Sequence, residues 1–361
     1  MRKPPRSRGG SSADRDARPR RPRSPPFLST FSSTFSSTVL GGPVAGRAPR
    51  NTHRQGRSGL GLRVLVTGGA GFLGSHVVDA LRARDDDVIV LDDLSTGDRK
   101  NLTAGADLRV ADIADRAALD AAIGRERFDA VVHCAAKTKV VESMAKRDLY
   151  ERVIVGGTKN VLALAREAGA KAFVNVSTGG AIYGETPTCA TETVPTNPES
   201  NYGRFKADAE KLVDASGLRA ANLRLANIYG PRQRTDLEGG VIAIFIACWK
   251  RGEPVTVFGD GSYERDYVYI ADVVEAILAA LAGKHRGTFN IGTGVATSVN
   301  GLVTALSAVL GPPAGVRHAA ARPGEVRRGC VDPAKAAREG LWRPRTPLAE
   351  GLRRTAAAEG H

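Results

Sequence analysis

The stretch RVLVTGGAGFLGSHVVDALRARD (Arg63–Asp85) and the run DVIVLDD (Asp87–Asp93) after it decide the fold. RVLVT is short, apolar and β-branched, as in a buried parallel strand, and SHVVDALRARD has the apolar spacing of a helix. The glycines of the GGAGFLG segment between them permit a tight turn and the close approach of a pyrophosphate to the helix N-terminus. A second strand ends at Asp92, about 20 residues further on, where a carboxylate can bind a ribose 2′-hydroxyl. We therefore predict a dinucleotide-binding βαβ unit.

Asp92 also bears on which dinucleotide is bound. A carboxylate at this strand end repels the 2′-phosphate of NADP, so the sequence favours NAD. In a plainer interpretation Asp92 only forms a turn after its strand, and Arg99 and Lys100 lie near enough in the sequence to host a phosphate. The position of the acid at the strand end favours the NAD interpretation.

Further apolar, strand-like runs are separated by helical stretches, and they lie at Leu108–Ile113, Asp129–Ala136 and Ala172–Thr178. An alternation of strands and helices is typical of parallel sheets whose helices cover both faces. The sequence therefore predicts an α/β fold built on a Rossmann-type doubly wound parallel sheet.

The excess of basic residues lies almost entirely at the N-terminal end. The 361 residues include 52 Lys+Arg and 38 Asp+Glu, for a net charge of +14, and residues 1–62 hold 13 of the basic residues with only two acids. The rest of the chain is close to neutral, so a nucleic-acid groove in the folded body has no electrostatic support. Residues 1–62 are rich in Arg, Pro and Ser, which is the composition of a disordered tail. We consider a transit peptide, a secretion signal, a basic arm for nucleic acid or anionic lipid and, as the favoured interpretation, an appendage without function.

The apolar runs and the cysteines of the sequence exclude further classes of protein. The longest apolar run, Val241–Trp249, has nine residues, well short of the roughly 20 that cross a bilayer. The four cysteines are isolated, without CxxC or His/Cys clusters of metal-ligand spacing: Cys134, Cys189, Cys248 and Cys330. We expect reduced thiols in a cytoplasmic protein that binds neither a metal nor a membrane.

The segment SNYGRFKADAEKLVDASG (Ser200–Gly217) is rich in helix formers and ends in glycine, which predicts a helix. Tyr202 and Lys206 are four residues apart and therefore share a face. Such a spacing often occurs by chance on a solvated helix. Its chemistry is specific, because an adjacent ammonium stabilises a phenolate and brings a tyrosine of ordinary pKa about 10 toward the range of a general base. The pair could exchange a proton with a sugar hydroxyl while NAD takes the hydride from the same carbon.

Several motifs occur together in a fixed order along the body of the chain: TGGAGFLGSH (Thr67–His76), LDDLSTG (Leu91–Gly97), HCAA (His133–Ala136), STGGAIYGE (Ser177–Glu185), YGRFK (Tyr202–Lys206), LRLANIYGPRQ (Leu223–Gln233), GDGSYERDYVYIADV (Gly259–Val273), NIGTG (Asn290–Gly294) and RPGEVRR (Arg322–Arg328). In this wording and order, residues 63–361 resemble the extended short-chain dehydrogenases/reductases of the NAD-dependent epimerase/dehydratase type. Within that family the sequence is most similar to the bacterial UDP-glucose 4-epimerases.

The resemblance implies NAD as cofactor and assigns site residues by motif. Three glycines would contact the pyrophosphate, Asp92 the adenosine ribose, Asp112 the adenine side and Ala135 the nicotinamide side. The full set of implied cofactor contacts is Gly68, Gly71, Phe72, Leu73, Gly74, Asp92, Asp93, Asp112, Ile113, Ala135, Ala136, Tyr202 and Lys206. Tyr202 would be the acid/base, and Lys206 would bind both the nicotinamide ribose and the tyrosine.

The same resemblance assigns the substrate side. It implies Thr178 as the hydroxyl that polarises the sugar O4, with Ser177 in reserve. Asn227 would contact the diphosphate of the sugar nucleotide, Arg265 and Arg322 would clamp its phosphates, and Glu325 would lie near the uridine ribose. Arginine suits a diphosphate because its planar fork makes paired, charge-assisted hydrogen bonds.

The stretch STGGAIYG favours one reaction within the family. Dehydratases and decarboxylases of the family have an acid two residues before the Tyr-Gly pair, where this chain has Ala181. C4 epimerisation of a UDP-hexose needs only the tyrosine, the lysine and a hydroxyl, so it is the favoured function. Alternatives are a 4-ketoreductase, a dehydratase, an epimerase of UDP-uronic acids or UDP-N-acetylhexosamines, and a non-catalytic nucleotide-binding regulator.

The resemblance finally implies the domain organisation. We expect an NAD-binding domain at residues 63–230, to which the chain returns at about 260–295, and a smaller substrate-binding lobe mainly at 231–361, with the active site in the cleft between them. A homodimer is implied as well. At Ile154 the family commonly has asparagine, so a polar contact on the cofactor side is missing.

Overall fold

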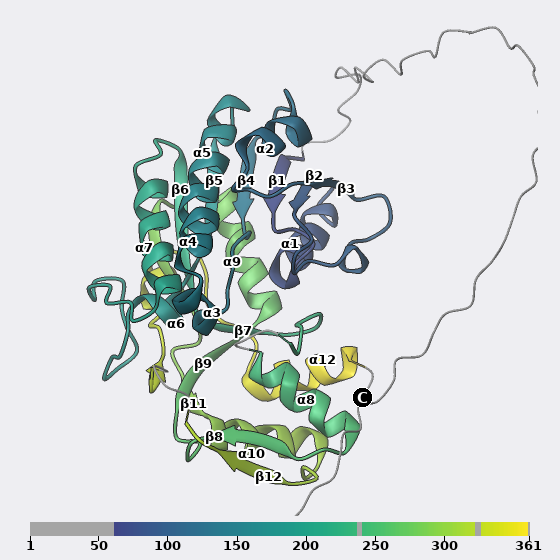
Figure 1. Ribbon diagram of the computed structural model, residues 1–361, viewed down its shortest axis with the longest axis vertical. Helices are drawn as coiled ribbons and strands as arrows, with labels where there is room; N and C mark the ends of the chain where they lie inside the picture. The colour runs from purple at the N-terminus through teal and green to yellow at the C-terminus, as the bar shows by residue number, and fades with distance from the viewer. Residues whose placement is uncertain (1–60, 237–239, 322–325, 360–361) are drawn as a thin grey trace, which may run out of the picture. The chain divides into compact units, whose positions relative to one another are not determined.

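Figure 1 shows the computed structural model, which describes residues 61–236, 240–321 and 326–359. A seven-stranded parallel sheet with strand order β10-β6-β5-β4-β1-β2-β3 is its largest sheet. The strands are β1 (Arg63–Thr67), β2 (Asp87–Asp92), β3 (Asp107–Val110), β4 (Ala130–His133), β5 (Ala172–Thr178), β6 (Arg219–Leu225) and β10 (Gly287–Ile291). The strand order reverses beside β1, with β2 on one side and β4 on the other, and ligands of such sheets bind at this point, beyond the carboxyl ends of the strands.

Helices lie on both faces of the sheet (Figure 1), and successive residues of a strand point to opposite faces. On β1, Val64 and Val66 belong to one apolar cluster together with α1 and α9, whereas Leu65 belongs to another together with α2 and α5. The long helices that flank the sheet are α1 (Phe72–Arg82), α2 (Arg116–Ile123), α5 (Gly157–Glu167), α7 (Asn201–Asp214) and α9 (Ile270–Ala282). The prediction of a doubly wound parallel sheet is confirmed.

Short helical segments complete the sheet region. They are the 3-10 turn Arg99–Asn101, α3 (Val140–Ala145), α4 (Arg147–Glu151) and α6 (Gly179–Ile182). A π-helical turn, Arg152–Gly156, joins α4 to α5 without a break. Such turns interrupt the regular hydrogen-bond pattern of a helix and are frequent near functional sites.

The C-terminal part of the chain forms smaller sheets with their own helices (Figure 1). One four-stranded sheet contains β7 (Asn227–Tyr229), β9 (Glu264–Tyr269), β11 (Ala296–Ser298) and β13 (Arg328–Gly329), and a parallel pair contains β8 (Val255–Phe258) and β12 (Val316–Ala319). The accompanying helices are α8 (Val241–Arg251), α10 (Val299–Leu310), α11 (Ala334–Arg338) and α12 (Leu348–Ala358). The chain leaves the large sheet after β6 and returns to it at β10.

Two of the four cysteines are paired, so the expectation of four reduced thiols is wrong. Cys189 and Cys330, 141 residues apart in the sequence, form a disulfide. A β-bridge between Ala190 and Val331 brings them together. Because only the folded chain makes these residues neighbours, their spacing in the sequence gave no sign of the bond. Cys134 and Cys248 are free thiols.

None of the helices in the described ranges combines the length and apolar character needed to span a bilayer. In the same ranges, no group of three or more His, Cys, Asp or Glu side chains is placed to hold a metal ion.

Candidate active site

The turn after β1 is shaped for the close approach of a ligand. Gly68 has a φ of +68°, which favours glycine. A Cβ on Gly74 would lie 2.0 Å from the carbonyl oxygen of Gly68, so the absence of a side chain lets α1 pack against the turn. The N-cap of α1, Gly71, makes no side-chain hydrogen bond, which leaves backbone N–H groups for an anion. Turn and helix therefore fit a dinucleotide pyrophosphate.

Asp92, at the end of β2, is held by backbone amides. Its Oδ2 accepts a hydrogen bond from the Ala70 N–H at 2.9 Å, and its Oδ1 accepts one from the Leu94 N–H at 2.8 Å. Burial raises the pKa of the carboxyl, and these hydrogen bonds act against the rise. Asp92 lines the main cavity, whereas Arg99 and Lys100 do not, so the alternative phosphate site near these two cations lacks support.

A cavity of about 1100 Å³ runs from the glycine turn to the smaller sheets. This volume exceeds the roughly 300–1,000 Å³ typical of a site for a single small ligand. It brings together most of the residues predicted from the sequence: Gly68, Gly71, Phe72, Leu73, Gly74, Asp92, Asp93, Asp112, Ile113, Ala135, Ala136, Ser177, Thr178, Tyr202, Asn227 and Arg265. Lys206 is buried and does not line the cavity. Arg322 and Glu325 lie outside the described residues.

The start of α7 is fixed by its cap and by close packing. The Ser200 Oγ accepts a hydrogen bond from the Gly203 N–H at 3.1 Å. A Cβ on Gly203 would lie 2.2 Å from the Ala181 carbonyl oxygen, so glycine lets this turn of α7 contact α6. Tyr202, next to Gly203, is thereby held in the cavity wall.

Tyr202 and Thr178 both line the cavity, and the Thr178 hydroxyl lies beside the Tyr202 phenol. Burial raises the pKa of the Tyr202 phenol to about 12, and the nearby Thr178 hydroxyl acts against this rise. Ser177, the other hydroxyl considered from the sequence, is buried and donates its hydrogen to Glu210 Oε1 at 2.5 Å. The geometry therefore favours Thr178 as the hydroxyl that acts beside the tyrosine.

Lys206 is only 5% exposed. Its Nζ donates a hydrogen bond to the Val176 carbonyl oxygen at 2.5 Å. Burial lowers the pKa of this ammonium to about 8, while the nearby Glu210 carboxylate acts in the opposite direction. The sequence predicted that Lys206 lowers the pKa of Tyr202, but in the structure burial raises that pKa, and the group that acts against the rise is Thr178.

On the substrate side, Asn227 begins β7 and Arg265 lies on β9. The Arg265 guanidinium donates to the carbonyl oxygens of Glu264 at 2.8 Å and Arg327 at 3.4 Å. These contacts fix one edge of the guanidinium beside the cavity, which Arg265 lines together with Asn227.

Ile154 occupies a different place from the one assumed in the sequence argument. It is 2% exposed and lies in an apolar cluster with Tyr150, Phe205 and Ala209. Its neighbour Val153 lines the cavity, and Ile154 does not. The aliphatic side chain thus packs the π-helical turn against α7.

Sequence reasoning missed other residues at this site. Arg232 lines the cavity, and its guanidinium is held by Asp79 Oδ2 at 2.7 Å and Ser75 Oγ at 3.2 Å. Lys137, also in the lining, donates to Ser95 Oγ at 2.9 Å. Arg232 lies in the motif LRLANIYGPRQ and Lys137 directly follows HCAA, but only the fold shows that they line the cavity.

The model of one protein family, described as the NAD dependent epimerase/dehydratase family, matches residues 64–292. The chain belongs to this family. Another member, named a putative UDP-glucose 4-epimerase, from Methanocaldococcus jannaschii, is 40% identical over 296 residues, which cover 81% of this chain and 96% of that relative. The family's UDP-glucuronic acid decarboxylases and a dTDP-glucose 4,6-dehydratase also match.

Solved structures of family members agree with the fold. A UDP-glucose 4-epimerase from Thermotoga maritima, solved with UDP-glucose, is 39% identical with a TM-score of 0.80, covering 82% of this chain and 98% of that one. A UDP-glucose 4-epimerase from Thermus thermophilus, solved with NAD, is also 39% identical, with a TM-score of 0.78 and coverage of 83% and 99%. The predictions of an NAD-dependent enzyme of this family, and of its likeness to UDP-glucose 4-epimerases, are confirmed.

Proposed function

We propose that the protein catalyses C4 epimerisation of a UDP-hexose, interconverting UDP-glucose and UDP-galactose. The observation that carries the proposal is the placement of the Tyr202 phenol and the Thr178 hydroxyl together in the cavity wall, with the buried Lys206 one helical turn from Tyr202. A phenol, a hydroxyl and an ammonium in this arrangement can exchange a proton with a sugar hydroxyl. Similarity to two solved UDP-glucose 4-epimerases over more than four-fifths of the chain supports the same activity.

The glycine turn and the N-terminus of α1 would hold the pyrophosphate of NAD, and Asp92 its adenosine ribose. When bound, NAD supplies an acceptor for the hydride from C4 that can give the same hydride back. Tyr202 would take the proton from the O4 hydroxyl and later return it. Thr178 would donate a hydrogen bond to O4, and the Lys206 charge would favour the phenolate and bind the nicotinamide ribose. Burial alone keeps Tyr202 protonated at neutral pH, so its two partners have to offset burial when it acts as a base.

The substrate would lie across the cavity toward the smaller sheets. We assign NAD binding to residues 63–230, to which the chain returns at about 260–295, and substrate binding mainly to 231–361. Asn227 on β7 and Arg265 on β9 belong to the four-stranded sheet and line the same cavity as the glycine turn of the large sheet. Asn227 and Arg265 would contact the diphosphate, with Arg322 as the second phosphate clamp and Glu325 near the uridine ribose.

The loop after β5 argues against the elimination reactions of other family members. Ala181, where the resemblance places the acid of dehydratases and decarboxylases, has no ionisable group. The next acid along this loop, Glu185, accepts hydrogen bonds from the backbone N–H groups of Arg327 at 2.7 Å and Arg328 at 3.1 Å. Its carboxylate is therefore already engaged in holding the segment before β13. Ketoreduction, or epimerisation of a UDP-uronic acid or UDP-N-acetylhexosamine, remains as the alternative activity.

The test is conversion of UDP-galactose to UDP-glucose by the purified protein without added cofactor. We expect turnover by the wild type and a fall in kcat of about 10²- to 10⁴-fold in Tyr202→Phe, the range that general acid–base catalysis contributes. Tyr229→Phe is the matched control, because its hydroxyl is buried, makes one hydrogen bond to the Leu348 carbonyl at 3.3 Å and does not line the cavity. A wild-type protein that holds NAD but leaves UDP-galactose unconverted would contradict the hexose assignment.

The proposal includes a homodimer acting in the cytoplasm, and both points stay predictions. Light scattering of the full chain at micromolar concentration would measure the oligomeric state. A mass of twice the 38.0 kDa chain is the expected result.

A further inference from the structure

The face of α7 that carries Tyr202 and Lys206 continues one turn further to Glu210. All three residues face the end of β5 at consecutive positions. Lys206 Nζ donates to the Val176 carbonyl oxygen at 2.5 Å, Ser177 Oγ donates to Glu210 Oε1 at 2.5 Å, and the Thr178 hydroxyl lies beside the Tyr202 phenol. Three turns of the helix thus face three successive residues of one strand. Glu210 is the member of this series that does not line the cavity.

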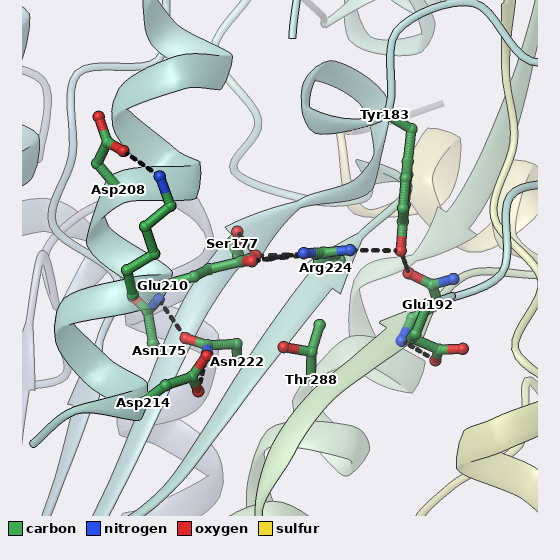
Figure 2. Close-up of polar contacts among 12 residues, drawn as sticks. Asn175, Ser177, Tyr183, Glu192, Asp208, Glu210, Asp214, Asn222, Arg224 and Thr288 are labelled. Atoms are coloured by element: carbon green, nitrogen blue, oxygen red, sulfur yellow. Dashed lines mark hydrogen bonds and ion pairs between the residues drawn. The ribbon is translucent and has the colours of Figure 1, made fainter. Parts of the chain in front are cut away.

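Glu210 is itself held by a buried cation. Its side chain is 5% exposed, and Oε2 accepts a hydrogen bond from the Arg224 guanidinium on β6 at 2.7 Å. A second contact joins Arg224 Nε to Oε1 at 3.0 Å, so the pairing is bidentate (Figure 2). Paired bonds of this kind fix the orientation of both groups as well as neutralising them.

The pair is anchored further into the fold. Arg224 donates to the Tyr183 hydroxyl at 2.8 Å (Figure 2). That hydroxyl donates to Asn290 Oδ1, on β10, at 2.7 Å. Burying an ion pair is costly, and a hydrophobic pair of equal size often stabilises a protein as well or better. Stability alone therefore does not explain why a charged pair is buried here.

We propose that Glu210 is a positioning residue for the Tyr202–Lys206 pair, fixing through Ser177 and Arg224 the end of β5 that binds the Lys206 ammonium and presents the Thr178 hydroxyl. The proposal deepens the proposed function, because it rests on the acid/base role given to Tyr202. Glu210 does not line the cavity, so it acts only through these neighbours.

The groups around Lys206 show why the negative charge of Glu210 affects the protonation of the Lys206 ammonium. The charged or titratable groups that interact with the ammonium are His133 and Cys134 at the end of β4 and Glu210 on α7 itself. Burial lowers the pKa of His133 to about 3 and raises the pKa of the Cys134 thiol to about 12, so both are neutral near pH 7. Glu210 is therefore the anion that favours the protonated form of Lys206.

The test compares Glu210→Gln with the wild type and two other variants. We expect kcat for the UDP-hexose to fall about 10- to 100-fold, the range that a small misplacement of reacting groups costs, with KM changed less than threefold. The alkaline limb of the pH profile moves to lower pH, because Lys206 loses its proton more easily. Ser177→Ala lowers kcat without moving this limb, since the carboxylate and its charge remain. Asp208→Asn, which removes an exposed partner of Lys211 on the same helix, changes neither quantity.

A second measurement needs no substrate. The protein labelled with ¹³C-lysine reports the titration of Lys206 through its side-chain NMR shift, assigned with Lys206→Met, and this pKa falls in Glu210→Gln. If the wild type converts no UDP-hexose, the proposed function fails while this titration still tests the role of Glu210. If Glu210→Gln does not fold, Glu210→Gln/Arg224→Met removes both buried charges and gives the same shift. An unmoved Lys206 titration would overturn the proposal, as would an unchanged kcat, or a lower kcat matched by an equal rise in KM.

Discussion

At Gly74 the packing of α1 against the preceding turn leaves no room for a side chain. A Cβ there would lie 2.0 Å from the Gly68 carbonyl oxygen and 2.7 Å from the Gly69 Cα, and both are backbone atoms that move only with the turn itself. Overpacking of this kind costs about 1–3 kcal/mol, which corresponds to a loss of about 5- to 150-fold in binding. We predict that Gly74→Ala weakens NAD binding by this factor, measured by calorimetric titration of NAD.

The matched control for that substitution is another glycine in a helical segment. Gly156 lies in the π-helical turn, and a Cβ built there would have no neighbour within 4 Å. Gly156→Ala should keep NAD affinity within about twofold. The free energy of unfolding should stay the same or rise slightly, since alanine is the better helix former. Equal affinity in both variants would show that the glycine turn does not hold the pyrophosphate.

Between elements, the disulfide fastens the loop after α6 to the segment after β13. Cys189 and Cys330 close a loop with a sequence separation of 141, and disulfides across long loops commonly stabilise a protein by about 2–4 kcal/mol. We predict that Cys189→Ser/Cys330→Ser unfolds at a lower Tm, by several degrees, and that dithiothreitol lowers the Tm of the wild type to the same value. Cys248→Ser, which removes a free thiol, should respond to the reductant as the wild type does. A wild-type Tm that ignores the reductant would argue that the two sulfurs are not bonded in solution.

The elements themselves could largely be predicted, because their signals are local. The βαβ unit follows from apolar runs around a glycine turn, and α7 follows from its helix formers, with Tyr202 and Lys206 one turn apart. Local patterns cannot show which strands become neighbours. Arg224 meets Glu210 because β6 lies beside β5 under α7. For the same reason the Cys189–Cys330 disulfide could not be predicted from the sequence, because it depends on a β-bridge between distant segments.

For the molecule as a whole, the buried Lys206 serves the proposed function but lowers the free energy of unfolding. Burial lowers its pKa from 10.5 to about 8. A folded-state pKa below the unfolded one means that the unfolded chain binds the proton more tightly, so this residue destabilises the fold at neutral pH, by about 3 kcal/mol at about 1.4 kcal/mol per tenfold change in proton affinity. The penalty is complete below about pH 8 and disappears as the pH rises toward the unfolded value. Stability attributable to Lys206 therefore increases with pH across this window.

Lys206→Met keeps much of the side-chain volume and removes the charge. We predict that this variant is inactive yet more resistant to urea than the wild type at pH 7, by up to about 3 kcal/mol less the lost hydrogen bond to Val176, which is worth about 1 kcal/mol. Because the wild type gains stability as Lys206 loses its proton, the difference should shrink steadily between pH 8 and 10.5. Urea unfolding of both proteins at a series of pH values measures it. A constant difference across that range would mean that Lys206 titrates alike in the folded and unfolded chains. Burial of its charge would then not destabilise the fold.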